Sequence, residues 1–246
     1  MFTRLLVGID GSPAGDAGLE QGVVLGRQFR STIVVAHIVP DGGGRTDVSR
    51  LLDAARERVW AGSLTAEVIE TSGAPDLELA RLAQGVDAVL VGRRGSSTPS
   101  PALGPTAVSL IRIARCCVIV CGGTASAMRS CAIAFDGGET SMRALELAAR
   151  FASVAGTVLH IIHAAADRMR ALQVVGVAEA TLSLQRVEFV THIDSGRPGE
   201  VIARVLKETR CDGLFAGAHA ARRGGPADSH VEEILRHTEI PVLVQP

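Results

Sequence analysis

The sequence predicts an α/β protein of two tandem doubly wound domains, each a five-stranded, mostly parallel sheet flanked by helices. Short apolar segments alternate with segments whose apolar residues recur at helical spacing, which is the pattern of parallel strands joined by crossover helices. This pattern starts again after a linker of small residues at 122–126. With 246 residues, the chain is also longer than a usual single domain.

The first half contains five predicted strands separated by four predicted helices. Its strands are apolar runs, as expected of strands buried on both faces of a parallel sheet, and right-handed crossovers connect them. We expect the strands at Thr3–Asp10, Thr32–Val39, Leu64–Thr71, Asp87–Val91 and Cys117–Cys121. We expect the helices from Ser12 or Pro13 to Phe29 and at Asp47–Trp60, Leu77–Gln84 and Ala107–Arg115.

The second half repeats the first in the same register. Asp10 and His37 are 27 positions apart, as are Asp136 and His163, and Gly92 follows Asp10 by 82 positions where Gly217 follows Asp136 by 81. We therefore predict two copies of one domain, at 1–123 and 128–246. The repeated strands are expected at Cys131–Asp136, Val158–His163, Val187–Ile193, Asp212–Gly217 and Pro241–Val244.

Composition argues against several classes of function. Although 47% of the residues are hydrophobic, no stretch approaches the run of about 18 uncharged apolar residues that a membrane span needs, and the N-terminus lacks the design of a signal peptide. A soluble, cytoplasmic protein is expected. A net charge of −1 with 3% aromatic residues argues against nucleic acid or a membrane as partner. The five cysteines match no zinc or redox spacing and are expected to be buried, reduced thiols.

The segment 87–106 has the design of an anion-binding turn. A buried strand runs into Gly92-Arg93-Arg94-Gly95, and after a loop rich in Ser, Thr and Pro the residues Gly104-Pro105-Thr106 open a helix. Glycines allow close backbone approach, the first N–H groups of a helix attract anions, and arginine suits phosphate. The alternative is an ordinary tight turn between a strand and a helix, which needs the same glycine.

The order of these motifs along the chain resembles the universal stress protein family. One strand ends in Asp10-Gly11-Ser12, the next ends near His37, Ser72-Gly73-Ala74-Pro75 precedes a helix, and the Gly92–Gly95 and Gly104–Thr106 motifs follow. The resemblance covers essentially the whole chain, as in a tandem two-domain member. It implies a Rossmann-like fold of the adenine nucleotide alpha hydrolase type and an ATP site across the carboxyl ends of the strands.

The resemblance also implies which residues contact the nucleotide. Asp10 would meet the adenosine part, and backbone near Gly8, Ile9 and Ile38 would line the base. Ribose and phosphates would lie against the end of the fourth strand and its loop, and the phosphate tail against the helix start, with any Mg²⁺ held mainly by the phosphates. The residues implied at the end of the fourth strand and its loop are Val91, Gly92, Arg94 and Gly95, and those implied at the helix start are Gly104, Thr106 and Ala107.

Two departures from the family pattern put nucleotide binding in question. Eight residues, not nine, separate Gly95 from Gly104, and Pro105 replaces the Ser or Thr that binds phosphate. Proline lacks an N–H and a hydroxyl, and the loss of a hydrogen bond to a charged group weakens binding roughly tenfold to a hundredfold. In the second half, Ala220 replaces the second glycine and Asp228 stands near the phosphate position. We expect that half not to bind ATP in the family's way.

The residue patterns favour a regulator over an enzyme. No catalytic triad motif, metal-binding HExxH motif or Walker motif is present. Asp10 has an alternative reading as a residue that ends its strand and caps a helix, and His37 and His163 are expected to form local hydrogen bonds. We expect a stress-response regulator that binds ATP in its first domain without catalysis and acts on a protein partner not named by the sequence. The alternatives are a scaffold that has lost nucleotide binding and a slow ATP hydrolase.

Family resemblance further implies that the last strands pair. Universal stress proteins commonly dimerise through that strand, which is a natural sheet edge. In this chain Cys117–Cys121 and Pro241–Val244 would then pair within one molecule as an internal pseudo-dimer. The sequence does not decide whether the whole chain also forms a homodimer.

Overall fold

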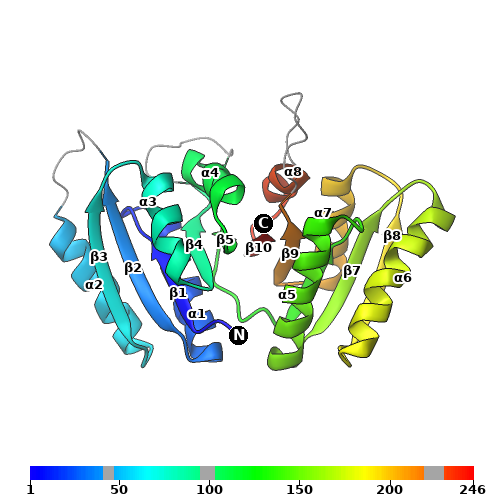
Figure 1. The fold of residues 1–246 in the computed structure, drawn as a ribbon, viewed down its shortest axis with the longest axis horizontal. Helices are drawn as coiled ribbons and strands as arrows, with labels where there is room; N and C mark the ends of the chain where they lie inside the picture. The colour runs from blue at the N-terminus through cyan, green and yellow to red at the C-terminus, as the bar shows by residue number, and fades with distance from the viewer. Residues whose placement is uncertain (41–46, 95–102, 219–229) are drawn as a thin grey trace. The chain divides into compact units, whose positions relative to one another are not determined.

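The computed structural model describes residues 1–40, 47–94, 103–218 and 230–246. The chain divides into two compact units, Phe2–Ala127 and Met128–Pro246, with Met1 grouped with the second. We refer to them as the first and second domains and describe each by itself (Figure 1). The predicted pairing of the two last strands concerns the relation between the domains and stays a prediction.

The first domain is a parallel five-stranded sheet flanked by helices, as predicted (Figure 1). Its strands follow the order β3-β2-β1-β4-β5, and every pairing in it is parallel. The strands are β1 (Arg4–Gly8), β2 (Thr32–Val39), β3 (Ala66–Ser72), β4 (Ala88–Gly92) and β5 (Cys117–Cys121). The helices are α1 (Pro13–Phe29), α2 (Val48–Ala61), α3 (Pro75–Leu82), the short 3-10 helix η1 (Ala83–Gly85) and α4 (Pro105–Ile113).

The second domain repeats this architecture with the same strand order, β8-β7-β6-β9-β10, again all parallel. Its strands are β6 (Ser130–Ala134), β7 (Val158–Ala164), β8 (Phe189–Asp194), β9 (Gly213–Gly217) and β10 (Val242–Gln245). Its helices are α5 (Glu139–Ala155), α6 (Arg168–Leu184), α7 (Pro198–Thr209) and α8 (His230–His237). The internal repeat predicted from residue spacing is thus present in the fold.

Several element boundaries differ from the predicted ones, and proline explains two of them. Helices α3 and α4 begin at Pro75 and Pro105, two residues earlier than predicted, because proline suits the first helical position, where its missing N–H has no partner in the helix. Helix α4 ends at Ile113 because Ala114 is extended, with φ −66° and ψ 146°. Strand β1 ends at Gly8 and not at the predicted Asp10, although the N–H of Ile9 still donates to the carbonyl of Ala36 in β2 at 2.9 Å.

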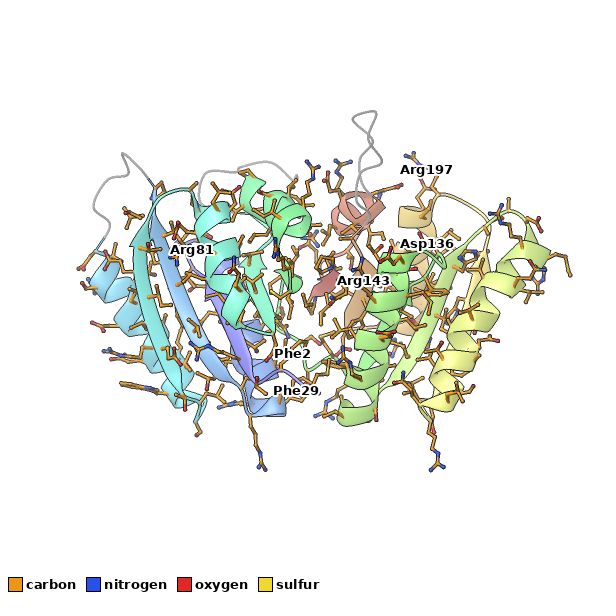
Figure 2. The ribbon with its side chains drawn as sticks, viewed as in Figure 1. Phe2, Phe29, Arg81, Asp136, Arg143 and Arg197 are labelled. Carbon is orange, nitrogen blue, oxygen red and sulfur yellow. The ribbon has the colours of Figure 1, made fainter. Side chains whose placement is uncertain are left out.

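The central strands form the core of each domain. Leu5, Leu6 and Val7 of β1 are fully buried, and burying each such side chain contributes about 1.5–3 kcal/mol. Phe2 and Phe29 close the core at the end of the first domain opposite the carboxyl ends of its strands, with ring centroids 5.4 Å apart in an edge-to-face contact (Figure 2). In each domain the loops that follow the strands are therefore attached to a buried, well-packed sheet.

All five cysteines are free thiols, as predicted. Four of them are buried, whereas Cys116 is only half-buried. Burial raises the pKa of Cys116 to about 11 and that of Cys121 to about 12, so both are protonated at neutral pH. In the described part of the chain, no helix combines the length and apolarity needed to cross a bilayer.

Candidate functional site

The predicted site residues gather at the carboxyl ends of the strands in the first domain. Strand β1 lies between β2 and β4, with Gly8 paired to Ala36 and Val7 to Leu90. The chain leaves β1 toward β2 on one side and returns through β3 to β4 on the other, and such a switch point is where open α/β sheets bind ligands. The topology brings together Gly8, Ile9, Asp10, Ile38, Val91 and Gly92, whereas Gly95 lies outside the described residues.

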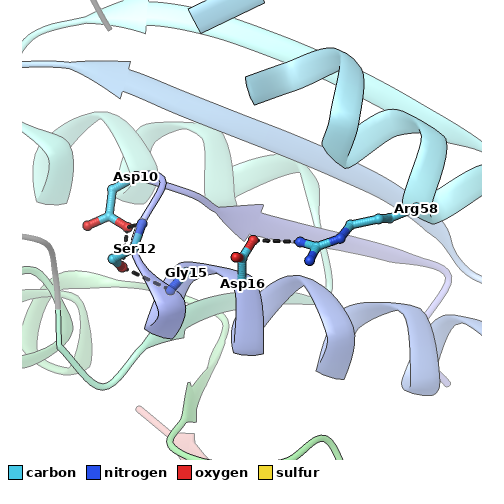
Figure 3. Close-up of polar contacts among 5 residues, drawn as sticks. All are labelled: Asp10, Ser12, Gly15, Asp16 and Arg58. Carbon is cyan, nitrogen blue, oxygen red and sulfur yellow. Dashed lines mark hydrogen bonds and ion pairs between the residues drawn. The ribbon is translucent and has the colours of Figure 1, made fainter. Parts of the chain in front are cut away.

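Asp10 organises the turn between β1 and α1 (Figure 3). One oxygen of its carboxylate, Oδ1, accepts hydrogen bonds from the backbone N–H and the hydroxyl of Ser12, the first at 3.0 Å. Ser12 is the N-cap of α1, and its Oγ accepts the N–H of Gly15 at 3.1 Å. Gly11 has φ +76°, a conformation that favours glycine. The cap is therefore Ser12, which sequence reasoning missed, and Asp10 supports it.

Gly92, the first glycine of the predicted anion-binding turn, is required by packing. A Cβ at this position would lie 2.5 Å from the carbonyl carbon of Ala14 in the first turn of α1. The end of β4 and the start of α1 thus touch through backbone, and no side chain fits between them. This contact places the N-terminus of α1 beside the carboxyl end of β4.

His37 serves a local structural role, as predicted. Its Nδ1 lies 2.9 Å from the carbonyl oxygen of Ile9, and the side chain is only 7% exposed. Because a carbonyl oxygen only accepts, Nδ1 carries the hydrogen. This bond ties the end of β2 to the residue before Asp10 and fixes the position of the Asp10 turn.

The start of α4 presents backbone donors at the same end of the sheet. Gly104 is the N-cap, its N–H donates to the carbonyl of Arg93 at 2.7 Å, and no side chain caps the helix. The N–H groups of Thr106 and Ala107 belong to the first turn, where an α-helix offers no internal acceptor. Pro105 supplies no N–H, so this helix start has one donor fewer than usual.

The two arginines bring positive charge to this region. Arg93 is 3% exposed, and its backbone N–H donates to the carbonyl of Cys121 at 2.8 Å, which holds it at the ends of β4 and β5. Arg94 follows it and is half-buried. A hydrogen bond of 2.6 Å from the Ser109 hydroxyl in α4 to the Asp76 carboxylate in α3 links these two helices. Neutral donors, positive charge and one carboxylate thus surround this edge of the sheet.

The match to a family model decides the identity of the fold. The model described as the universal stress protein family matches residues 1–122 and, a second time, residues 128–246. The chain belongs to the universal stress protein family. No curated protein matches it significantly.

Two solved structures share the fold over nearly the full chain. A universal stress protein from Archaeoglobus fulgidus DSM 4304 is 22% identical and has a TM-score of 0.80, covering 98% of this chain and 97% of its own. A functionally unknown protein from Pseudomonas aeruginosa PAO1 is 18% identical, with a TM-score of 0.75 and coverage of 99% and 92%. A universal stress protein solved in complex with cAMP is 21% identical, with a TM-score of 0.41 and coverage of 48% and 96%.

The second universal stress protein domain preserves the supports of the first. Oδ1 of Asp136 accepts the N–H of Gly138 at 2.8 Å, and His163 Nδ1 lies 2.7 Å from the carbonyl of Phe135. A Cβ on Gly217 would lie 2.4 Å from the carbonyl carbon of Thr140 in α5, just as a Cβ on Gly92 would meet the backbone of α1. The predicted departures at Ala220 and Asp228 lie outside the described residues. Among the residues that are described, no group of three or more His, Cys, Asp or Glu is placed to hold a metal.

Proposed function

We propose that the first domain binds an adenine nucleotide, ATP with Mg²⁺, as a non-catalytic ligand of a stress-response regulator. The observation that carries the proposal is the convergence of the Asp10 turn, the Gly92 end of β4 and the α4 N-terminus at the switch point of the sheet. Family membership supports the same position. A polar base and sugar would lie over β1 and β2, and the phosphates toward α4.

Charge and donor placement fit a phosphate tail beside α4. The first-turn N–H groups of Thr106 and Ala107 and the guanidinium groups of Arg93 and Arg94 are all donors or positive charges. Mg²⁺ would be held mainly by phosphate oxygens and water. The ligand is thus recognised by positioning and charge neutralisation.

The polar side chains nearest the switch point form hydrogen bonds within the local structure. This supports a bound nucleotide that regulates the protein over one that is a substrate of catalysis. Asp10 holds Ser12, and His37 donates to the Ile9 carbonyl, so both are oriented by the fold. We propose that ATP instead changes which protein partner the chain meets. Partner capture that is identical with and without ATP would contradict this part of the proposal.

One observation favours a second candidate, a scaffold that has lost nucleotide binding. Pro105 occupies the first position of α4, where the family has a serine or threonine, and its side chain is exposed. The scaffold hypothesis predicts no ATP binding in either domain. Restoring the missing donor separates the two candidates.

The experiment is calorimetric titration of the full chain with ATP and Mg²⁺, compared with the variant Pro105→Ser. We expect one ATP per chain and binding that is about tenfold to a hundredfold tighter in the variant, because an N–H and a hydroxyl are regained. Pro198→Ser, at the first position of α7 in the second domain, is the matched control and leaves the affinity unchanged. Absence of binding by both the natural chain and Pro105→Ser at millimolar ATP would favour the scaffold.

A further inference from the structure

A pocket in the second domain occupies the position that corresponds to the nucleotide site of the first. It has a volume of about 190 Å³ and lies at the carboxyl ends of β6, β7 and β9, between α5, α7 and α8. Aligning Asp136 with Asp10 and Gly217 with Gly92 makes Phe135 the counterpart of Ile9. The second domain therefore keeps a cavity at its switch point although its sequence departs from the family's phosphate-binding motif.

The walls of this pocket are mostly apolar and buried. Phe135, Ile162, Ile202, Val231 and Ile234 line it, and each is at most 4% exposed. Smaller side chains stand where the first domain has larger ones, since Ala164 corresponds to Ile38 and Ala216 to Val91. Its volume is below the roughly 300–1,000 Å³ of pockets for drug-sized ligands, so it suits a body of one or two rings.

The polar side chains that line the pocket all present acceptors. Ser141 is 2% exposed and its hydroxyl donates to the carbonyl of Gly138 at 3.0 Å, which leaves oxygen lone pairs. His163 uses Nδ1–H for the Phe135 carbonyl, so Nε2 of the neutral ring is an acceptor. Asp136 contributes a carboxylate beside the start of α5 (Figure 2). No lysine or arginine is among the lining residues of this described pocket.

We propose that the second domain binds a small molecule with a compact apolar or aromatic body and a cationic or N–H-rich group, of the amidine or amine class. Such a ligand places its donors against Asp136, His163 and Ser141 and its body against the apolar wall. An anion at the same place would meet a carboxylate and two acceptors, so repulsion and uncompensated desolvation disfavour phosphate. This site is independent of the nucleotide proposed for the first domain.

The test compares benzamidine with benzoate, two probes that share a phenyl ring but carry opposite charge and opposite hydrogen-bonding character. Binding to the full chain at pH 8 is measured by NMR titration. We expect benzamidine to bind at least about tenfold more tightly than benzoate, the ratio given by one hydrogen bond to a charged group. Benzoate binding as tightly as benzamidine, or no binding of benzamidine at millimolar concentration, would overturn the proposal.

Variants in both domains locate the site. Asp136→Asn keeps an oxygen for the Gly138 N–H but removes the charge, so it should weaken benzamidine about tenfold, while the matched Asp10→Asn should not. Ile202→Trp fills the pocket and should abolish binding. If Ile202→Trp does not fold, Ala164→Ile with Ala216→Val narrows the pocket using side chains that the first domain already has. Weaker binding in Asp10→Asn with no change in the second-domain variants would refute the assignment.

Discussion

The two domains share a framework of backbone contacts but differ in the side chains around the switch point. In both, the glycine that ends the fourth strand packs against the first turn of the domain's first helix, so that an added Cβ would lie 2.5 Å from backbone at Gly92 and 2.4 Å at Gly217. In both, a buried histidine donates to the carbonyl before the aspartate, through His37 and His163. The comparison teaches that packing fixes where a ligand can bind, while a few side chains decide which ligand fits.

The side chains that differ between the two domains lie around the switch point of each sheet. Ser12 caps α1 through its hydroxyl, whereas its counterpart at the start of α5, Gly138, has no side chain. The second domain has a serine three residues later, because Ser141 corresponds to Gly15 of the first domain. The second domain therefore directs a hydroxyl oxygen into the pocket where the first domain has a glycine. Such exchanges leave the strand order unchanged and alter only the chemistry of the site.

The largest effect is expected from adding a methyl group at the two shared glycines. Gly92→Ala and Gly217→Ala each force a Cβ against backbone, which cannot move aside as a side chain can. We expect each to lower the free energy of unfolding of its own domain by about 2–3 kcal/mol. Urea unfolding followed by hydrogen-exchange mass spectrometry reports each domain separately.

Two other glycines provide the control for this effect. A Cβ on Gly85 in the first domain or on Gly176 in the second would meet nothing within 4 Å. Gly176→Ala lies inside α6 and should stabilise it by about 0.5–1 kcal/mol. Equal losses from Gly176→Ala and Gly217→Ala would show that the backbone contact is not the cause.

A smaller effect distinguishes the domains by their response to acid. His160 and His192 lie on neighbouring strands β7 and β8, with Nδ1 of the first 2.9 Å from Nε2 of the second. Burial lowers the pKa of both imidazoles, and the pKa of His160 is lowered further by the charge of His192. Glu208 and Asp194 raise the pKa of His192 in partial opposition, and Arg204 pairs with both carboxylates.

Because the folded pKa values lie below the unfolded one, the stability linked to this pair is present above about pH 6.5 and is lost as the pH falls. The first domain has Val34 and Ile69 at the matching positions. We expect acidification from neutral pH to lower the melting temperature of the second domain by a few degrees more than that of the first. His160→Val with His192→Ile should remove the difference, and an unchanged acid response in that variant would contradict the explanation.

The smallest effect concerns an ion pair that only the first domain has. Arg4 and Glu67 form two contacts of 2.6 Å, but their side chains are 40% and 44% exposed. Solvent screening limits such a pair, so Glu67→Gln should cost at most about 0.5 kcal/mol and less at high salt. Ser130 and Val190 stand at the matching positions of the second domain. Urea unfolding at low and high NaCl checks this, and a salt-independent loss above about 1 kcal/mol would contradict it.

The fold could be predicted from sequence because local patterns determine it. An apolar run such as Thr32–Val39 indicates a strand buried on both faces of a parallel sheet, and it forms β2. The equal spacing from Asp10 to His37 and from Asp136 to His163 indicated the repeat. Boundaries were less predictable where a turn interrupts an apolar run. The predicted first strand extended to Asp10, but the strand ends at Gly8 and only the N–H of Ile9 still donates to β2, while the Asp10 carboxylate accepts the N–H of Ser12.

Features of the site that depend on distant contacts could not be predicted. Nothing in the sequence near Gly92 indicates that Ala14 lies against it, because that contact arises from how α1 packs on the sheet. The His160–His192 pair was missed for the same reason, since it depends on the register of β7 with β8. The register of the repeat could have shown that Ala164 and Ala216 replace larger residues, which is the signal for the second pocket.

The most direct test of the central claim, that one framework carries two different sites, is the number of ATP molecules bound per chain at saturation. Leu79 follows Pro75 by four residues as Ile202 follows Pro198, and it packs against Gly8 at the end of β1. Equilibrium dialysis with labelled ATP and Mg²⁺ measures the number for the natural chain, for Ile202→Trp and for Leu79→Trp, with circular dichroism to confirm folding. We predict one ATP per chain, retained in Ile202→Trp and lost in Leu79→Trp. Two ATP per chain, none, or loss of the nucleotide in Ile202→Trp alone would contradict the account.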